Sequence, residues 1–167
     1  MKKLSTLFLG TIFAVTASAQ IPNAGFESWT AGTGYDTPDS WGTANPLTAA
    51  LLTFTCEKGT TGAPEGSNYI KLTSKTATLI TIPGIAVTGT ITLSGTTPSI
   101  SGGFASTARP ASLSGKWQYM ASGSDHAHIG VFLSKWNSTL SKRDTVAKLD
   151  TALGGMVMSW STFSLPL

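Results

Sequence analysis

The strongest constraint on this chain is the alternation of side-chain types between His126 and Trp136. Every second residue from Ala127 to Leu133 is aliphatic, whereas the positions between them carry His126, His128 and Phe132. Because successive side chains of a β-strand point to opposite faces, a period of two predicts a strand with two distinct faces. We therefore expect an all-β protein, in which the rest of the mature chain supplies the other strands of the same sandwich.

Further runs rich in β-branched and aromatic residues recur along the chain, separated by turn-forming residues. Short strands at such spacings are typical of a sandwich or barrel. The expected strands are residues 21–29, 52–56, 68–73, 78–82, 86–93, 112–121, 126–136, 143–149 and 160–167. Pro83-Gly84 predicts a hairpin turn between two of them. No long helix is expected, and residues 149–158 come closest to a helical pattern.

The N-terminus has the composition of a secretory signal peptide. Met1-Lys2-Lys3 is basic, residues 4–15 are mostly apolar, and Ala17-Ser-Ala19 is a small-residue cleavage site. The apolar stretch is too short to serve as a stable membrane anchor. We therefore expect residues 1–19 to be removed, and residues 20–167 to form a single secreted β-sandwich domain that does not insert into a membrane.

Charge and cysteine content exclude some classes of function. Loss of Lys2 and Lys3 leaves nine basic and eight acidic residues, so the net charge falls from +3 to +1. This weak charge, without a cluster of basic residues, argues against a nucleic-acid partner. Cys56 is the only cysteine and cannot form an intrachain disulfide; its alternation with Phe54 predicts a small buried apolar residue rather than a nucleophile.

Three motifs resemble a known family. The run from Ile21 to Trp29 (IPNAGFESW), followed by Thr37-Pro-Asp-Ser-Trp41, is similar to the opening of many secreted bacterial jelly-roll modules. Residues 108–119 (ARPASLSGKWQY) resemble the central strand of those modules. They are galactose-binding-like carbohydrate modules and include the putative carbohydrate metabolism domain group, of which many members are cargo of the type IX secretion system. The resemblance implies an antiparallel jelly-roll β-sandwich.

The resemblance also has consequences for the end of the chain. Residues 160–167 (WSTFSLPL) are similar to a strand after which family members continue with further strands and often a sorting domain. The run ending at Leu167 is still apolar, which leaves an open edge where a partner strand is expected. We therefore expect a C-terminally truncated fragment that lacks the last strands of the sandwich, with a terminal edge strand as the alternative.

Aromatic and imidazole side chains predict a sugar-binding face. Sugars stack their C–H faces on exposed rings, and polar side chains bind their hydroxyl groups. If residues 112–121 and 126–136 form neighbouring strands, their rings pave one sheet face, with an arginine as a polar clamp. The alternative is that the tryptophans pack in the core. The expected ligand-binding residues are Arg109, Trp117, Tyr119, His126, His128 and Trp136.

Metal binding has weaker support. In the family, an N-terminal Glu and a late Asp share a structural calcium; Glu27 matches the first, and no residue matches the second. Calcium takes six to eight oxygens, so Glu27 is the single expected ligand, with a surface or turn carboxylate as the alternative. His126 and His128 have a spacing that suits zinc, but no third histidine exists, and a solvent-facing pair is expected.

Three functions remain open. We expect a secreted, non-catalytic carbohydrate-binding module whose partner is a polysaccharide or glycan and which needs no cofactor other than the possible calcium. The alternative is a structural or adhesive cell-surface module that binds protein. A glycan-active enzyme is the third, and it requires two carboxyl groups facing each other across a cleft. No recognisable catalytic motif is present.

Overall fold

The computed structural model describes residues 21–95 and 97–167, so the predicted signal peptide, residues 1–19, lies outside the described residues. The described chain is mainly β-strand, with one short helix, α1 (Asn45–Thr48), followed by a 3-10 turn, η1 (Ala49–Leu51). Every strand pair is antiparallel. The prediction of an all-β, antiparallel fold is therefore confirmed. Within the described residues, no helix has the length and apolar character needed to cross a membrane.

The strands differ greatly in length. They are β1 (Trp29–Ala31), β2 (Asp36–Pro38), β3 (Gly42–Thr43), β4 (Cys56–Gly59), β5 (Tyr69–Leu72), β6 (Lys75–Ala77), β7 (Ile80–Ile82), β8 (Ala86–Val87), β9 (Thr90–Ser94), β10 (Thr97–Ser101), β11 (Ser112–Tyr119), β12 (His126–Asn137), β13 (Lys142–Gly154) and β14 (Val157–Pro166). They pair as β1–β2, β3–β8, β4–β5, β6–β7, β9–β10, β11–β14 and β12–β13. These are two-stranded sheets, so the two continuous sheets of a jelly-roll β-sandwich are not confirmed.

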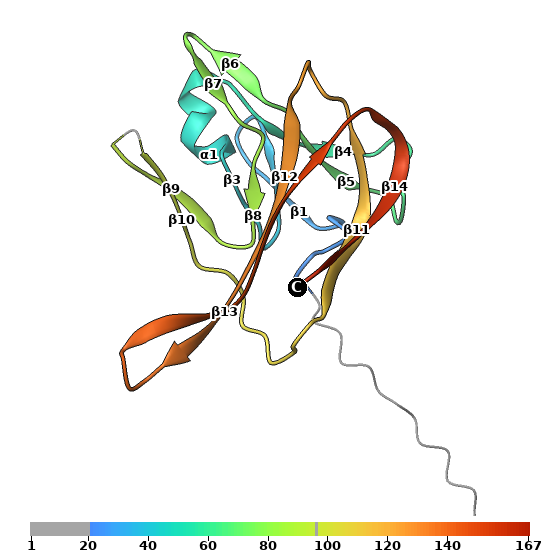
Figure 1. Ribbon diagram of the computed structural model, residues 1–167. Helices are drawn as coiled ribbons and strands as arrows, with labels where there is room; N and C mark the ends of the chain where they lie inside the picture. The colour runs from blue at the N-terminus through green and yellow to red at the C-terminus, as the bar shows by residue number, and fades with distance from the viewer. Residues whose placement is uncertain (1–20, 96) are drawn as a thin grey trace, which may run out of the picture.

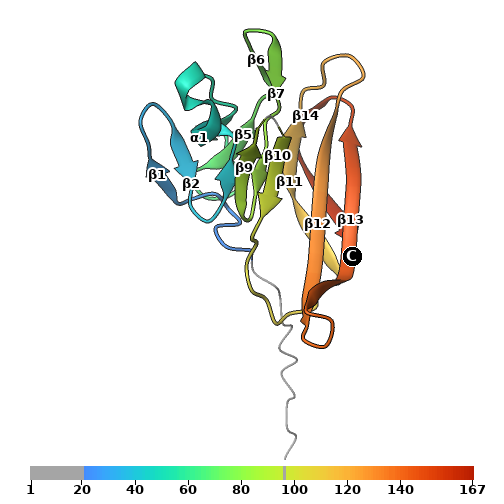
Figure 2. The same ribbon diagram turned by 90° about the vertical axis from the view of Figure 1, so that its left-hand side faces the viewer.

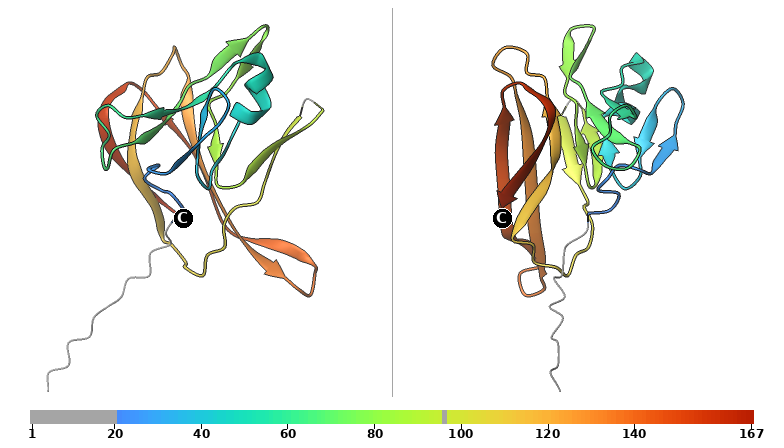
Figure 3. Two further views of the ribbon diagram at one scale, coloured as in Figure 1. Left: turned by 180° about the vertical axis from the view of Figure 1, so that it is seen from behind. Right: turned by 90° about the vertical axis from the view of Figure 1, so that its right-hand side faces the viewer.

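The molecule has two contrasting regions. We call β1 to β10 the N-terminal region and β11 to β14 the C-terminal region. Figures 2 and 3 show the four C-terminal strands on one side of the molecule and β1 to β5 with α1 on the other. The β12–β13 hairpin is long, and its tip projects beyond the rest of the molecule (Figure 1).

Strict alternation builds the C-terminal region. Along β12, the aliphatic residues from Ala127 to Leu133 are half-buried, whereas His126, His128 and Phe132 are exposed. Their partners on β13 follow the same pattern, because residues opposite each other in the register share a face. The ladder shifts after Leu133, where Val146 is an additional residue on β13. The two faces predicted for this strand are confirmed.

The N-terminal region contains every fully buried residue among those described. They are Pro38, Thr43, Ala44, Asn45, Thr48, Thr55, Cys56 and Ile91. Half of them are polar and form one hydrogen-bonded centre. Asn45, which has no exposed surface, donates from Nδ2 to the Cys56 carbonyl at 2.7 Å. Its Oδ1 accepts the backbone N–H groups of Thr55 at 2.9 Å and Cys56 at 3.1 Å. One amide side chain therefore joins α1 to the start of β4.

Several local predictions are wrong. Residues 22–25 form a turn and residues 26–28 are irregular, so no strand forms before Trp29; Asn23 and Phe26 have positive φ angles. The Asn23 side chain stabilises this conformation by donating to the carbonyls of Ser28, at 2.9 Å, and Asp39, at 3.0 Å. An asparagine tolerates the left-handed region better than most residues. The backbone around Asn23 therefore turns, although the side-chain pattern predicts a strand.

The hairpin predicted at Pro83-Gly84 is also wrong. β7 pairs with β6 across a turn at Thr78, where φ is +58°, and β8 pairs with β3 instead. Residues 149–154 continue β13 and are not helical. Residues 97–101, for which no strand is predicted, form β10 against β9. Side-chain pattern identifies the short strands β6 to β10 poorly, because they offer too few residues for a period to show.

Candidate functional site

The six predicted ligand-binding residues do not share one face. β11 pairs with β14 and β12 pairs with β13, so Trp117 and Tyr119 lie on a different sheet from His126, His128 and Trp136. The idea that their rings pave one sheet face is therefore wrong. The idea rests on the closeness of β11 and β12 in sequence. In the structure, β11 pairs with β14 instead.

Trp117 and Tyr119 occupy the half-buried face of β11. Their rings are stacked, with centroids 6.2 Å apart, along the same side as Leu113. The Tyr119 hydroxyl oxygen is buried and has no hydrogen-bond partner among the described residues. Burial of the hydroxyl and the nearby negative charge of Asp125 raise the pKa of Tyr119. Half-burial on one face of β11 favours the alternative considered for the tryptophans, in which they pack.

Arg109 lies exposed in the loop before β11, and no side-chain hydrogen bond or ion pair holds it against the rings among the described residues. His126, His128 and Trp136 all point outward from β12, and Trp136 is 56% exposed. His128 Nδ1 lies 3.7 Å from Asp150 Oδ1, and both side chains are mostly exposed. Three of the six predicted residues thus share one solvent-facing surface.

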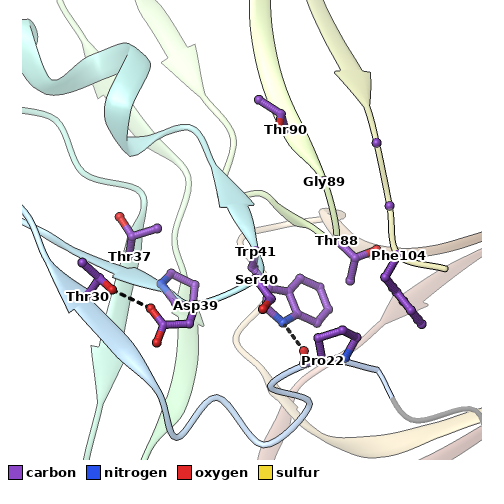
Figure 4. Close-up of a pocket in the computed structure, with 13 residues that line it drawn as sticks. Pro22, Thr30, Thr37, Asp39, Ser40, Trp41, Thr88, Gly89, Thr90 and Phe104 are labelled. Carbon is purple, nitrogen blue, oxygen red and sulfur yellow. Dashed lines mark hydrogen bonds between the residues drawn. The ribbon is translucent and has the colours of Figure 1, made fainter.

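A groove in the N-terminal region is not predicted from the sequence. It is a shallow, solvent-open depression of about 640 Å³ between the β1–β2 hairpin and the segments that flank β9 and β10. Figure 4 shows Asp39 and Thr30 at one end and Thr88 and Phe104 at the other, with Trp41 and Pro22 between them. Its lining residues are Pro22, Thr30, Thr37, Pro38, Asp39, Ser40, Trp41, Thr88, Gly89, Thr90, Gly102, Gly103 and Phe104.

Local hydrogen bonds fix the polar end of the groove. Thr30 Oγ1 donates to Asp39 Oδ1 at 2.7 Å, and the β1–β2 ladder pairs Thr30 with Thr37. The Trp41 indole donates from Nε1 to the Pro22 carbonyl at 3.0 Å, and its ring packs on Phe26 with centroids 4.9 Å apart. Trp41 is therefore held as a wall of the groove, while Asp39 Oδ2 takes no part in these contacts.

Glycines form the opposite wall. A Cβ on Gly89 would clash with the Ser101 carbonyl, and Gly102 and Gly103 have φ angles of +92° and +115°. Only glycine adopts such angles without strain, so this wall presents bare backbone beside Phe104, which is 39% exposed. The sequence signal is the Gly102-Gly103 pair near an aromatic residue, but nothing in the sequence places it opposite Asp39.

Glu27 does not fit a calcium site. Its carboxylate accepts N–H groups from Ser67, at 3.0 and 3.2 Å, and from Asn68, at 3.1 Å from both the backbone and Nδ2. Donors of positive partial charge thus already occupy the oxygens that a cation would need. The described residues contain no group of three His, Cys, Asp or Glu side chains able to hold a metal. Glu27 is the turn acceptor that we considered as the alternative.

The remaining carboxylates also have local donors. Asp36 pairs with Lys58 at 2.7 Å, and Glu57 pairs with Lys75 at 2.7 Å. The hydrogen bond from Lys75 is the main reason that the pKa of Glu57 is lowered. Cys56 is buried, and that burial, followed by the charge of Glu57, raises the pKa of its thiol to about 11. A protonated, inaccessible thiol is a poor nucleophile, which confirms the prediction of a buried small residue.

Comparison of the chain with protein-family models, curated protein sequences and solved structures gives no match. The resemblance to secreted jelly-roll carbohydrate modules therefore stays a prediction. Functional inference for this chain depends on the geometry of the groove and of the exposed β12–β13 surface.

Proposed function

We propose that this protein is an exported, non-catalytic carbohydrate-binding module and that the groove holds the sugar. The observation that carries the proposal is the composition of the groove. One carboxylate, Asp39, and several threonine and serine hydroxyls line it together with the Trp41 and Phe104 rings. Aromatic surface with a few fixed polar groups is the usual make-up of a small-ligand site.

Each part of the groove suits one part of a sugar. The Phe104 ring is exposed enough to stack against a C–H face. Asp39 Oδ1 already accepts from Thr30, which leaves Oδ2 to accept from sugar hydroxyls. Charged acceptors make stronger hydrogen bonds than neutral ones, so Asp39 provides most of the orientation. Export is supported by the signal-peptide composition of residues 1–19.

The rival functions draw on other features. Among the described residues, Asp39 is the only carboxylate that lines the groove. Glycoside hydrolysis commonly uses two, so binding is favoured over a glycan-active enzyme. An adhesive module that binds protein is the second candidate. It is favoured by the tip of the β6–β7 hairpin, where Leu79 is 93% and Ile80 is 70% exposed.

Glycan-array binding and affinity electrophoresis of the mature chain test the proposal. Asp39→Asn keeps an oxygen for Thr30 and removes the charge, and Phe104→Ala removes the stacking surface. Each is expected to weaken sugar retention at least about fivefold, as for loss of one charged hydrogen bond or one ring contact. Leu79→Ala is the control, because it shortens an exposed apolar side chain at the β6–β7 tip.

Two results would contradict the proposal in different ways. Retention that is unchanged in both groove variants would place the sugar elsewhere. Absence of retention for every glycan tested, together with loss of protein adhesion in Leu79→Ala, would favour the adhesive function.

A further inference from the structure

The outward surface of the β12–β13 hairpin combines aromatic rings with cations. We call it the ribbon face and define it by His126, His128, Phe132 and Trp136 on β12 and by Arg143, Lys148 and Asp150 on β13. All are exposed, with Phe132 at 62% and Trp136 at 56%. Within the register, Phe132 lies directly opposite Lys148, and Trp136 lies directly opposite Arg143. Each ring therefore has one cation as its cross-strand neighbour.

The two ring–cation pairs repeat along the strand. Phe132 and Trp136 are four residues apart on one face, which is about 14 Å at the usual rise of a strand. A single small ring cannot reach both pairs, whereas an extended polymer lying along the hairpin can. Ser134 lies between them, and Arg143 Nη1 approaches its Oγ at 3.4 Å. The guanidinium is thereby directed along the ribbon face.

The end of the hairpin is held in shape. Asn137 Oδ1 accepts the backbone N–H groups of Thr139 and Leu140, both at 3.1 Å, and its Nδ2 donates to Asp144 at 2.6 Å. The Asn137 side chain therefore orders the turn between Trp136 on β12 and Arg143 on β13. A preorganised surface loses less side-chain entropy on binding, so the second ring–cation pair is a defined feature of the protein.

The charge of the ribbon face favours an anionic partner. Lys148 and Arg143 flank the rings, whereas Asp150, the acidic residue of this face, lies beside His128 toward the other end. Lys142 and Lys135 belong to the opposite face of the same hairpin, since their register partners are Asn137 and Asp144. The positive charge of the ribbon face is thus placed beside aromatic rings.

We propose that the ribbon face is a second binding site and that it takes an acidic polysaccharide laid along β12 and β13. The sugar rings stack on Phe132 and Trp136, and their carboxylate or sulfate groups meet Lys148 and Arg143. The site is separate from the groove and uses none of its lining residues. The proposed site includes His126, His128 and Trp136, for which the sequence pattern predicts a carbohydrate ligand.

Other polyanions fit less well. A membrane-binding hairpin needs an apolar tip, but residues 137–141 are Asn-Ser-Thr-Leu-Ser. A nucleic-acid site needs a strong basic field, whereas the mature chain carries a net charge of about +1. An acidic polysaccharide requires both flat rings and a small number of cations, and the ribbon face offers that combination.

Polygalacturonate and dextran sulfate are suitable probes, each with its uncharged counterpart, methyl-esterified polygalacturonate and dextran. Retention of the mature chain on each immobilised polymer is measured at low and moderate salt. We expect retention on at least one acidic polymer and little on its counterpart. Trp136→Ala, and Lys148→Gln combined with Arg143→Gln, should each reduce it at least about tenfold, which corresponds to about 1.4 kcal/mol.

Matched controls separate the ribbon face from general charge and from the groove. Lys142→Gln removes one positive charge from the opposite face and should change retention less than about twofold, since exposed single charges contribute little. Asp39→Asn and Phe104→Ala alter the groove and should leave retention on acidic polymers unchanged. Thermal unfolding of each variant verifies that it is folded.

Several outcomes would overturn the inference. They are an effect of Lys142→Gln as large as that of the double variant Lys148→Gln with Arg143→Gln, equal retention on acidic and uncharged polymers, and preferred binding to phosphatidylglycerol vesicles or oligothymidylate. Absence of acidic-polymer binding in a chain that still binds glycans through Asp39 would refute the ribbon site and leave the groove proposal intact. Binding of acidic polymers, with no effect of Asp39→Asn or Phe104→Ala on the binding of any glycan, would refute the groove proposal and leave the ribbon site intact.

Discussion

Two asparagines show how differently the two regions of this protein are stabilised. Asn45 in the N-terminal region and Asn137 in the C-terminal region each accept two backbone N–H groups at Oδ1 and donate once from Nδ2. Asn45 has no exposed surface, whereas the hydrogen bonds of Asn137 lie at the solvent-exposed tip of the β12–β13 hairpin. The same set of hydrogen bonds is therefore expected to contribute differently to the free energy of unfolding in the two regions.

The difference follows from what surrounds each region. Short strands bury few apolar residues, and the buried apolar set is limited to Ala44, Cys56 and Ile91 among the described residues, with Pro38 beside them. The N-terminal region therefore depends on a hydrogen-bonded polar centre, because an unpaired buried polar group is costly. Thr55 Oγ1 is the buried side-chain atom of this centre that has no partner among the described residues. The C-terminal region contains no fully buried residue among those described and depends on long ladders with one half-buried face.

The segment from Thr60 to Asn68 joins the two regions. Glu27 accepts N–H groups of Ser67 and Asn68 on its N-terminal side. On the other side, the Trp160 indole donates to the Gly62 carbonyl at 2.7 Å, and Lys116 pairs with Glu65 at 2.9 Å. Packing between Tyr69 and Trp160, with ring centroids 5.2 Å apart, adds a contact between β5 and β14.

The largest expected effect breaks the polar centre. Asn45→Ala removes three hydrogen bonds and leaves backbone groups of Thr55 and Cys56 buried without partners. We expect the free energy of unfolding to fall by about 3 kcal/mol or more, since each unpaired buried group costs about 1–3 kcal/mol. Urea unfolding at equilibrium measures this change.

Asn137→Ala is its matched control, because it removes the same number of hydrogen bonds where water can replace them. The expected loss is below about 1 kcal/mol. Equal losses for Asn45→Ala and Asn137→Ala would mean that burial does not distinguish the two regions.

The next largest effect concerns the segment from Thr60 to Asn68, which joins the two regions. Gly66 has a φ of +62°, and a Cβ at this position would clash with the Glu27 carboxylate. Gly66→Ala should therefore destabilise the protein by about 2 kcal/mol or more, through backbone strain and loss of the Glu27 contacts. Thermal and urea unfolding measure it, and increased protease cleavage between residues 60 and 68 should accompany it.

Gly62→Ala separates strain from contact. Gly62 has a similar φ of +69°, but a Cβ added at this position would have no atom within 4 Å. The substitution should cost about 1 kcal/mol from the left-handed backbone alone. If Gly62→Ala and Gly66→Ala lower the free energy of unfolding by the same amount, the Glu27 contacts do not stabilise the segment from Thr60 to Asn68.

The smallest effect tests the two faces of the β12–β13 ladder. Val131 is half-buried on the inner face, and Val146 is 61% exposed at the register shift. Val131→Thr should cost about 1 kcal/mol, because it places a hydroxyl among apolar atoms. Val146→Thr should stay within about 0.5 kcal/mol. Urea unfolding compares them, and a reversed order would show that the inner face is not the stabilising one.

The two candidate ligand sites follow the same division. The groove lies in the N-terminal region, where turns and glycines bring Asp39 and Phe104 together from segments far apart in sequence. The ribbon face lies on one regular hairpin, where register alone sets Trp136 beside Arg143. The shared face of His126, His128 and Trp136 can therefore be predicted from the sequence, whereas the groove cannot.

The regular parts of this protein can be predicted from the amino-acid sequence. The period of two from Ala127 to Leu133 predicts both the strand and its faces, because pleating sends adjacent side chains to opposite sides. Residues 112–121 are predicted as a strand from their composition, and the structure forms β11 over Ser112–Tyr119. Cys56 is buried as predicted, but Thr55 beside it is buried as well, so alternation with Phe54 is not the reason.

Strand pairing and the contacts between polar groups depend instead on how the whole chain folds. Pairing of β11 with β14, rather than with β12, places Trp117 and Trp136 on different sheets. The contacts of Asn45 with β4 and of Glu27 with Ser67 join residues distant in sequence. Periodicity reports which way a side chain points along its own strand, but partners across the fold depend on how the chain closes its loops and satisfies its buried polar groups.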